Sequence, residues 1–356
     1  MRIVNSAKAA FLLVLISGQA FAQSWSIDLW DIAIDDPTID RVRSESLEFM
    51  PDGKTLVTAG FFYDGITQTA IGEVRLVSAK DGALRGVLSG GAQTYALRAG
   101  ALARSPSGKW IAAGGLRGKI DLFDATAMKY VRTLQGEQAA TSCLQFSPDG
   151  KILAAAHGGR TIELWNHENG KKTASFSSPT EVWSIAFSPD GALLATGNSE
   201  GSTTIRDAKS GEERGRIPAQ EELGFLGCLA FSPDGKLLAA GGFPVVEGDS
   251  PIYVWRLQRA SDGGGKVTAK REARFQGHRE HTYSLAFSPD GKHLASANQD
   301  TTVRIWDVRT HRQFRPITAH TDFVYDVAFS PDGNSLATLG RESLKLWDFE
   351  QLRDAQ

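Results

Sequence analysis

The chain has 356 residues, of which 41% are hydrophobic and 22% are charged. This composition is typical of a globular protein with enough length for one large or two ordinary domains. The formal net charge is −2 at pH 7. Nucleic-acid binders usually carry a basic face or stripe, so this balance excludes nucleic acid as an expected partner.

Residues 1–22 have the pattern of a secretory signal peptide. Arg2 and Lys8 make a basic start, residues 9–16 are an unbroken apolar run, and Ala20-Phe21-Ala22 matches an A-x-A cleavage site. The run is far shorter than the roughly 20 residues that cross a bilayer. We therefore expect cleavage after Ala22 and export to a periplasm or to the outside, with no membrane span.

A turn motif, Ser-Pro-Asp-Gly or a close relative, recurs seven times at spacings of 41 to 56 residues. Proline suits the second position of a type I turn and glycine the fourth. Short β-rich runs flank each copy, such as YSLAFS before and KHLASA after, and TTVRIWD and QFRPITAH follow. Four short strands per unit of about 40 residues are typical of a propeller blade. The prolines of the motif are Pro51, Pro106, Pro148, Pro189, Pro233, Pro289 and Pro331.

These units resemble WD40 repeats from about Trp25 to Phe349. In four units a tryptophan closes the third strand, while Val77, Phe123 and Arg206 take its place in the others. The resemblance implies an all-β fold in one domain, residues 23–356: a seven-bladed β-propeller of four-stranded antiparallel blades. The four tryptophans are Trp165, Trp255, Trp306 and Trp347.

The sixth unit alone matches the family's full polar tetrad. The resemblance implies that its four side chains form a structural hydrogen-bonded chain across the blade, and a fully satisfied buried network rigidifies. The seventh unit has a loop one residue shorter, and the other five lack the histidine, so we expect those five to depend mainly on apolar packing. The sixth unit supplies His278, Ser296, Asp300 and Trp306, and the seventh offers His320, Thr338, Glu342 and Trp347.

The last unit ends at Trp347-Asp348 with eight residues left, too few for a secure fourth strand. An unpaired sheet edge is a liability. Residues 24–35 can supply the missing strand, so we expect the N-terminal segment to join the last blade and close the ring. The likeness of Leu29-Trp30-Asp31 to Leu346-Trp347-Asp348 is then accidental.

The two cysteines, Cys143 and Cys228, lie three residues before the inner-strand Phe146 and Phe231. They therefore occupy the same position in the third and fifth blades, with a whole blade between them. A disulfide needs Cα atoms within about 7 Å. We expect two buried free thiols.

By resemblance, the Pro-Asp-Gly turns lie at the bottom of the propeller and partners most often bind at the top. In the family, the positions that serve partner binding at the top match the residues six and four before each inner-strand phenylalanine of this sequence. Five of them are aromatic, all in blades four to seven, and large aromatics are enriched in binding hot spots. The positions six before are Arg43, Arg98, Ala140, Glu181, Phe225, His281 and Phe323, and those four before are Glu45, Gly100, Ser142, Trp183, Gly227, Tyr283 and Tyr325.

These residues have two interpretations. Trp183, Tyr283, Tyr325, Phe225 and Phe323 either form a surface patch or, because they share strand parity with the core phenylalanine, extend the core. Arg43, Arg98 and Glu181 either give the patch a charged side or are ordinary solvated charges. Two insertions, residues 61–72 and 242–251, would raise walls at the top, and the Gly-rich, basic stretch 258–274 is expected to be a mobile loop at the bottom.

No catalytic or metal-binding motif is present: there is no H-E-x-x-H, G-x-S-x-G or G-x-x-x-x-G-K-[ST]. The sequence favours a monomeric, non-enzymatic interaction scaffold of the cell envelope without a cofactor, holding a protein or peptide on its top face. The alternative is a propeller enzyme or ligand carrier with a metal, quinone or small molecule in the central channel. As charged or histidine side chains at the channel, which such an enzyme or carrier would need, the sequence offers only Arg43, Arg98, Glu45, Glu181 and His281.

Overall fold

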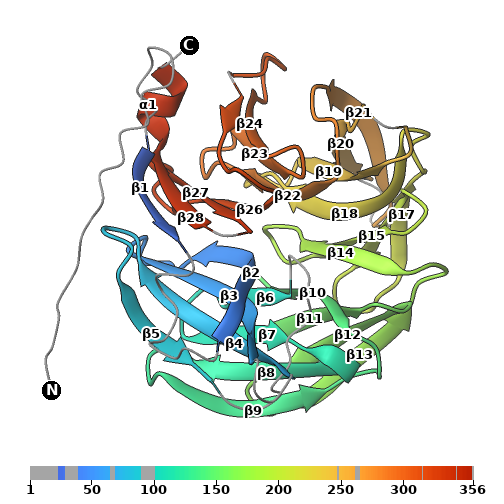
Figure 1. The fold of residues 1–356 in the computed structure, drawn as a ribbon. Coiled ribbons are helices and arrows are strands. Elements are labelled where there is room, and N and C mark those ends of the chain that lie inside the picture. The colour runs from blue at the N-terminus through green and yellow to red at the C-terminus, as the bar shows by residue number, and fades with distance from the viewer. Residues whose placement is uncertain are drawn as a thin grey trace, which may run out of the picture.

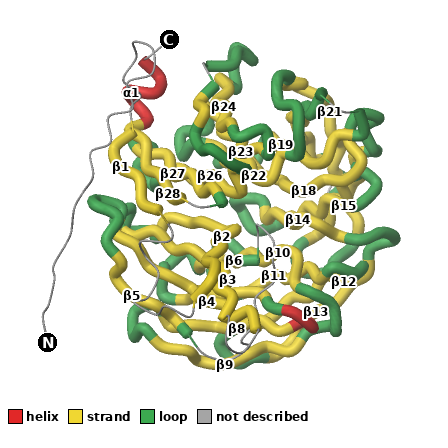
Figure 2. The backbone as a smooth tube through the Cα atoms, viewed as in Figure 1, coloured by secondary structure: helices red, strands yellow, loops and turns green. Residues whose placement is uncertain are grey.

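The computed structural model describes residues 23–28, 39–64, 69–89, 101–246, 248–260, 265–314, 316–341 and 343–354. This part forms seven four-stranded sheets, all with antiparallel pairing, arranged as a ring (Figure 1). Strands dominate the described backbone, and helix within it is limited to α1 (Phe349–Asp354) and the 3₁₀ turn η1 (Leu116–Gly118) (Figure 2). The seven-bladed propeller is therefore confirmed. Within the described residues no helix is long and apolar enough to span a membrane.

Each blade starts at the centre of the ring and ends at the rim (Figure 1). Blade 1 comprises β2 (Ile39–Phe49), β3 (Thr55–Asp64), β4 (Thr69–Ser78) and β5 (Leu84–Leu88). Blade 2 comprises β6 (Leu102–Arg104), β7 (Trp110–Gly114), β8 (Lys119–Asp124) and β9 (Lys129–Gln135). Blade 3 comprises β10 (Thr141–Phe146), β11 (Ile152–His157), β12 (Thr161–Asn166) and β13 (Lys171–Ser177).

The second half repeats this order. Blade 4 comprises β14 (Val182–Phe187), β15 (Leu193–Asn198), β16 (Thr203–Asp207) and β17 (Glu213–Ile217). Blade 5 comprises β18 (Leu223–Phe231), β19 (Leu237–Pro244), β20 (Ile252–Arg259) and β21 (Val267–Phe275). Blade 6 comprises β22 (Thr282–Phe287), β23 (His293–Asn298), β24 (Thr302–Asp307) and β25 (Ile317–Thr318).

Blade 7 takes its outer strand from the other end of the described chain. It comprises β26 (Val324–Phe329), β27 (Ser335–Gly340), β28 (Ser343–Asp348) and β1 (Gln23–Asp28). β1 pairs antiparallel with β28, with Gln23 opposite Trp347 and Asp28 opposite Ser343. The expected closure by the N-terminal segment is confirmed, whereas Leu29-Trp30-Asp31 lies outside the described residues.

The seven Pro-Gly turns also form a ring, because the glycine of each turn lies against the proline of the preceding blade's turn. A Cβ built on Gly333 would lie 3.5 Å from Cδ of Pro289, and one on Gly53 would lie 3.7 Å from Cδ of Pro331. These glycines adopt φ near +60° to +76°, a conformation that side chains disfavour. The recurrent motif therefore shapes the hairpin and also packs neighbouring blades together.

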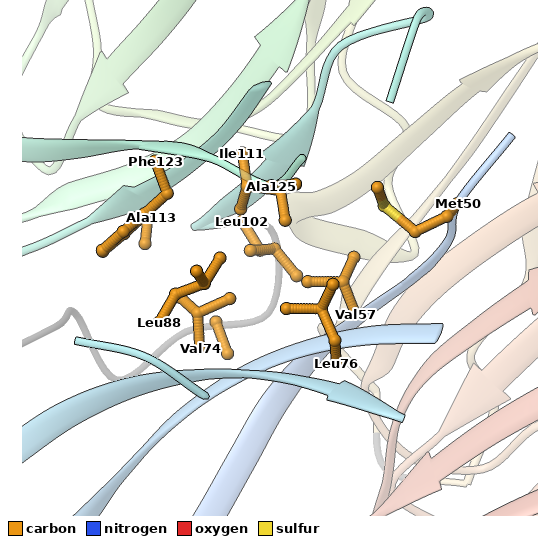
Figure 3. Packing of buried hydrophobic residues seen from close by; sticks show 11 residues of the cluster. Met50, Val57, Val74, Leu76, Leu88, Leu102, Ile111, Ala113, Phe123 and Ala125 are labelled. Atoms are coloured by element: carbon orange, nitrogen blue, oxygen red, sulfur yellow. The ribbon is translucent and has the colours of Figure 1, made fainter. Parts of the chain in front are cut away.

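Apolar packing lies between the blades rather than within them. Seven clusters of buried side chains occur, and each joins residues of two adjacent blades. Figure 3 shows the cluster between blades 1 and 2, in which Val57, Val74 and Leu76 face Leu102 and Ile111. The ring is thus a closed series of equivalent interfaces, including one between blades 7 and 1.

The structure defines the form of one expected insertion and corrects the expectation of a mobile loop. Part of the 61–72 insertion extends β3 and β4, which pair up to Asp64 opposite Thr69. The basic stretch 258–274 is largely strand, because β20 and β21 pair up to Arg259 opposite Val267. Its alternating apolar side chains, such as Val267 and Ala273, are buried, so the pattern was that of a strand rather than of a mobile loop.

Candidate functional site

The first strands carry a β-bulge at one repeated position. The pairing register shifts by one residue in blades 1 and 3 to 7. A bulged residue has no direct partner, and the bulge re-aims its side chain and reverses strand parity beyond it. The parity argument for a core role therefore fails. The bulged residues are Glu45, Ser142, Trp183, Gly227, Tyr283 and Tyr325.

Seven rings form a continuous series across the tops of blades 4 to 7. Six of them are half-buried and the seventh, Phe243, is 48% exposed. None belongs to an interblade core cluster. We call this series the aromatic arc. It consists of Trp183, Phe225, Phe243, His281, Tyr283, Tyr325 and Phe323.

Phe225 is the hub of one half of the arc. Its ring stacks on Trp183 with centroids 4.8 Å apart and on Phe243 at 5.4 Å. The His281 ring meets it edge-on at 5.1 Å. Each such contact is worth roughly 0.5–1.5 kcal/mol beyond the area it buries, so these rings hold one another in place.

The other half continues through blades 6 and 7. The rings of His281 and Tyr283 are 4.3 Å apart, those of Tyr283 and Tyr325 are 5.2 Å apart, and Phe323 meets Tyr325 edge-on at 6.3 Å. The Tyr283 hydroxyl donates a 3.3 Å hydrogen bond to Oε1 of Gln299. Burial lowers the pKa of His281 to about 4, so this ring is neutral at pH 7 and the arc carries no positive charge of its own.

Residues 242–246 and 248–251 of the fifth blade lie beside the arc, and we call them the wall. β18 and β19 extend beyond their counterparts, and Phe225 pairs with Phe243 at the top. The next residues, Val245 and Val246, are each 61% exposed. Exposed apolar side chains of this size next to a half-buried aromatic surface are typical of interaction sites.

A polar network fixes the wall. Arg274 Nη2 lies 2.8 Å from Asp249 Oδ2 and 3.4 Å from Glu222 Oε1, and the Tyr253 hydroxyl donates to Glu222 Oε2 at 2.5 Å. Backbone bonds hold the wall at both ends: Val245 N donates to Glu222 O at 2.9 Å, which continues the β18–β19 pairing, and Ser250 N donates to His278 O at 2.9 Å, in the loop that leads to blade 6. The wall is therefore preorganised.

The remaining predicted surface residues divide by location. Glu181 is exposed beside Trp183. Arg43 lies in β2 opposite Phe61, but its side chain lies outside the description, and Arg98 lies outside the described residues. Phe243 was missed by the sequence reasoning, although the insertion that carries it was recognised, because only first-strand positions were considered.

The sixth-blade tetrad is linked by hydrogen bonds. His278 Nε2 is 2.7 Å from Ser296 Oγ and His278 Nδ1 is 2.9 Å from Asp300 Oδ2, while Trp306 Nε1 donates to Ser296 Oγ at 3.1 Å. Burial opposes the charged form of Asp300, but hydrogen bonds from His278 and Thr302 outweigh it and hold its pKa at about 2. The tetrad lies within the blade and serves its rigidity.

The seventh blade has a similar network with a different terminal acceptor. His320 Nε2 is 2.9 Å from Thr338 Oγ1, to which Trp347 Nε1 donates at 3.0 Å. His320 Nδ1 is 2.9 Å from the Ser343 hydroxyl. Glu342 lies outside the described residues.

The third blade contains a buried polar chain that the sequence reasoning missed. His157 Nε2 is 3.0 Å from Glu163 Oε2, and Lys172 Nζ donates to Glu163 Oε1 at 2.5 Å. His157 Nδ1 is 3.5 Å from Thr141 Oγ1. Thr141, His157, Glu163 and Lys172 come from the four successive strands, so this blade does not depend on apolar contacts alone. A Glu two residues before the closing Trp165 was the available signal.

Cys143 and Cys228 are both free, as expected. Cys228 is buried, whereas Cys143 is only half-buried. Desolvation raises the pKa of Cys143 to about 11 and raises that of Cys228 further, so both thiols stay protonated and weakly reactive at pH 7. Among the described side chains no group of three or more His, Cys, Asp or Glu residues is placed to hold a metal ion.

Comparison with known proteins agrees with this architecture. The family model "WD domain, G-beta repeat" matches residues 128–166, 170–206, 221–250, 269–307 and 312–348. Four of these matches run from the outer strand of one blade through the third strand of the next. That offset explains why β1 must supply the outer strand of the last blade.

Three relatives, all from eukaryotes, illustrate the similarity. The WD repeat-containing protein SL1-17 of Schistosoma mansoni is 29% identical over 60% of this chain and 66% of that protein. The guanine nucleotide-binding protein subunit beta of Arabidopsis thaliana is 29% identical over 52% of this chain and 49% of that protein. The nuclear distribution protein nudF of Emericella nidulans is 27% identical over 50% of this chain and 42% of that protein. The chain thus spans about two thirds or less of these relatives, and because the family matches cover just over half of it, the chain belongs to the WD40-repeat family.

Proposed function

We propose that this propeller is a non-enzymatic interaction scaffold that holds a protein or peptide on its top face, at the aromatic arc. The observation that carries the proposal is the continuity of the arc across four blades, next to a rigid wall with exposed Phe243, Val245 and Val246. Rigid aromatic anchors in a surface that is already ordered are the usual centre of a protein interface. WD40 propellers generally mediate protein–protein interactions, which supports the same assignment.

The second part of the proposal is that the scaffold acts outside the cytoplasm, in a periplasm or after secretion. The support comes from residues 1–22 and from the position of β1. Cleavage after Ala22 would leave Gln23, the first residue of the closing strand, in place. The eukaryotic relatives do not bear on the compartment. Sequencing the N-terminus of the exported protein tests this part, and a chain that retains Met1 and stays in the cytoplasm would overturn it.

The interaction function is tested by removing the three bulged rings. A variant with Trp183→Ala, Tyr283→Ala and Tyr325→Ala is expected to lose partner capture in crosslinking within intact cells. The thermal midpoint should fall by only a few degrees, because the rings lie outside the interblade cores and their mutual contacts are worth about 0.5–1.5 kcal/mol each.

A matched control removes three exposed apolar side chains from the outer strands and turns of blades 1 and 2. Leu84→Ala, Met128→Ala and Tyr130→Ala change residues that are 45%, 41% and 37% exposed. This control should keep partner capture. If both variants capture partners equally well, or if the arc variant unfolds, the arc is a structural feature and the proposal fails.

A further inference from the structure

The loops that surround the aromatic arc carry an excess of acidic side chains. Four glutamates at the tops of blades 4 to 6 form no ion pair with a described cation, and three of them are exposed. The backbone holds two of them together, because Ser199 N donates to Glu181 O at 2.9 Å. We call these four side chains the acidic rim: Glu181, Glu200, Glu221 and Glu280.

Three members of the acidic rim lie in the chain segments that lead into arc residues. Glu181 is two residues before Trp183, Glu280 immediately precedes His281, and Glu221 is four residues before Phe225. The ring contacts already described place these three aromatics in one surface. The backbone of the acidic rim therefore flanks the arc in blades 4, 5 and 6.

Two described cations near these loops are neutralised internally. Arg274, at the end of β21, pairs with Asp249 and Glu222, and in blade 7 Arg341 Nη1 lies 3.3 Å from Asp322 Oδ2. Arg279 is exposed and has no described acidic partner within ion-pair distance. His281 is neutral at pH 7, since its pKa lies near 4. The local balance on the top of blades 4 to 6 is thus clearly negative.

Resting on the proposed function, we infer that the partner segment bound at the arc is a basic, apolar peptide, with Lys or Arg side chains placed over the rings. The faces of Trp and Tyr attract cations, and carboxylates close by add a long-range attraction. The long stems of Lys and Arg can cover apolar surface while their charged ends stay in water. Phe243, Val245 and Val246 offer such a surface, and an apolar side chain of the peptide would pack there too.

The test uses a random dodecapeptide phage library and the full propeller. Phage that bind the wild-type protein are collected and then passed over the variant with Trp183→Ala, Tyr283→Ala and Tyr325→Ala. Phage that also bind this variant are removed, so the remaining pool contains the binders that depend on the arc. The expected result is enrichment of Lys and Arg over Asp and Glu in that pool. Neutral or acidic arc-dependent binders would overturn the inference and leave the proposed function standing. A pool with no arc-dependent binder would overturn both.

Affinity measurements on one selected peptide then separate charge from shape. A variant with Glu181→Gln, Glu200→Gln, Glu221→Gln and Glu280→Gln should bind it about tenfold more weakly at about 50 mM NaCl. The loss should shrink at about 300 mM NaCl, where screening is stronger. The matched control makes the same charge change away from the top face, with Glu168→Gln, Glu212→Gln, Glu213→Gln and Glu350→Gln. Equal effects of the two variants, or a loss independent of salt, would refute the role of the acidic rim.

Discussion

Replacing Ser296 in the sixth blade by alanine should destabilise the propeller by about 2–6 kcal/mol, because two buried polar groups each lose a partner. The Ser296 hydroxyl is within hydrogen-bond distance of His278 Nε2 (2.7 Å) and Trp306 Nε1 (3.1 Å). His278 is 1% exposed and Trp306 2% exposed, so water cannot replace the hydroxyl. Each buried polar group left without a partner costs roughly 1–3 kcal/mol, and the loss of one methyl-sized polar group adds little cavity.

The seventh blade supplies the matched control. There Thr338 Oγ1 makes the equivalent contacts with His320 and Trp347 at 2.9 and 3.0 Å. Ser296→Thr keeps the hydroxyl and should stay within about 1 kcal/mol of the parent. Urea denaturation followed by circular dichroism measures both, and the midpoint should shift for Ser296→Ala without a change in the slope. A loss of less than about 0.5 kcal/mol in the free energy of unfolding for Ser296→Ala, or an equal loss for both variants, would refute the reasoning.

Two further predictions concern ring closure and pH. Deleting residues 23–28 removes β1 and exposes β28 as an edge strand, so the protein should unfold or self-associate; a stable monomer in sedimentation velocity would contradict the closure. Burial lowers the pKa of five histidines, with His281 near 4 and His320 near 3. Below pH 6.5 the unfolded chain therefore binds protons that the folded chain does not, and stability should fall by up to about 1.4 kcal/mol per pH unit for each histidine. Desolvation raises the pKa of Glu48 to about 7 and of Asp326 to about 6, which acts in the opposite direction between pH 4 and 7. Glu48→Gln with Asp326→Asn should accordingly steepen the loss on acidification in thermal scans from pH 7 to pH 4, and a shallower loss would show that the carboxyls were assigned the wrong sign.

The fold was predictable because its signals are local and repeated. Pro-Asp-Gly turns set the number of blades, and the closing tryptophans mark the third strands. Residues 24–35 were expected to supply the missing strand because the last unit lacked an outer strand and a β-like segment was free, and β1 spans Gln23–Asp28. The polar chain of the third blade was not predictable in the same way, because Thr141, His157, Glu163 and Lys172 match no known motif and meet only through tertiary packing.

The sequence indicated the aromatic positions of the arc but not their geometry. Sequence parity placed Trp183, Tyr283 and Tyr325 on the same strand face as the core phenylalanines. The bulge just before the regular part of each strand removes that equivalence, and no residue type at the bulge signals it, since the bulged position holds Glu, Ser, Trp, Gly and Tyr in different blades. The bulge is therefore seen in the strand pairing of the fold and not in the sequence.

The continuity of the arc depends on Gly227, which has no side chain. Gly227 occupies the bulge of the fifth blade, where its neighbours have Trp183 and Tyr283. A Cβ built on Gly227 would lie 2.7 Å from Nε2 of His281, closer than side chains approach one another. The missing side chain lets the His281 ring lie over this backbone and reach Phe225 at 5.1 Å and Tyr283 at 4.3 Å. A large residue at that bulge would separate the two halves of the arc, so glycine at this one position joins them into a single surface.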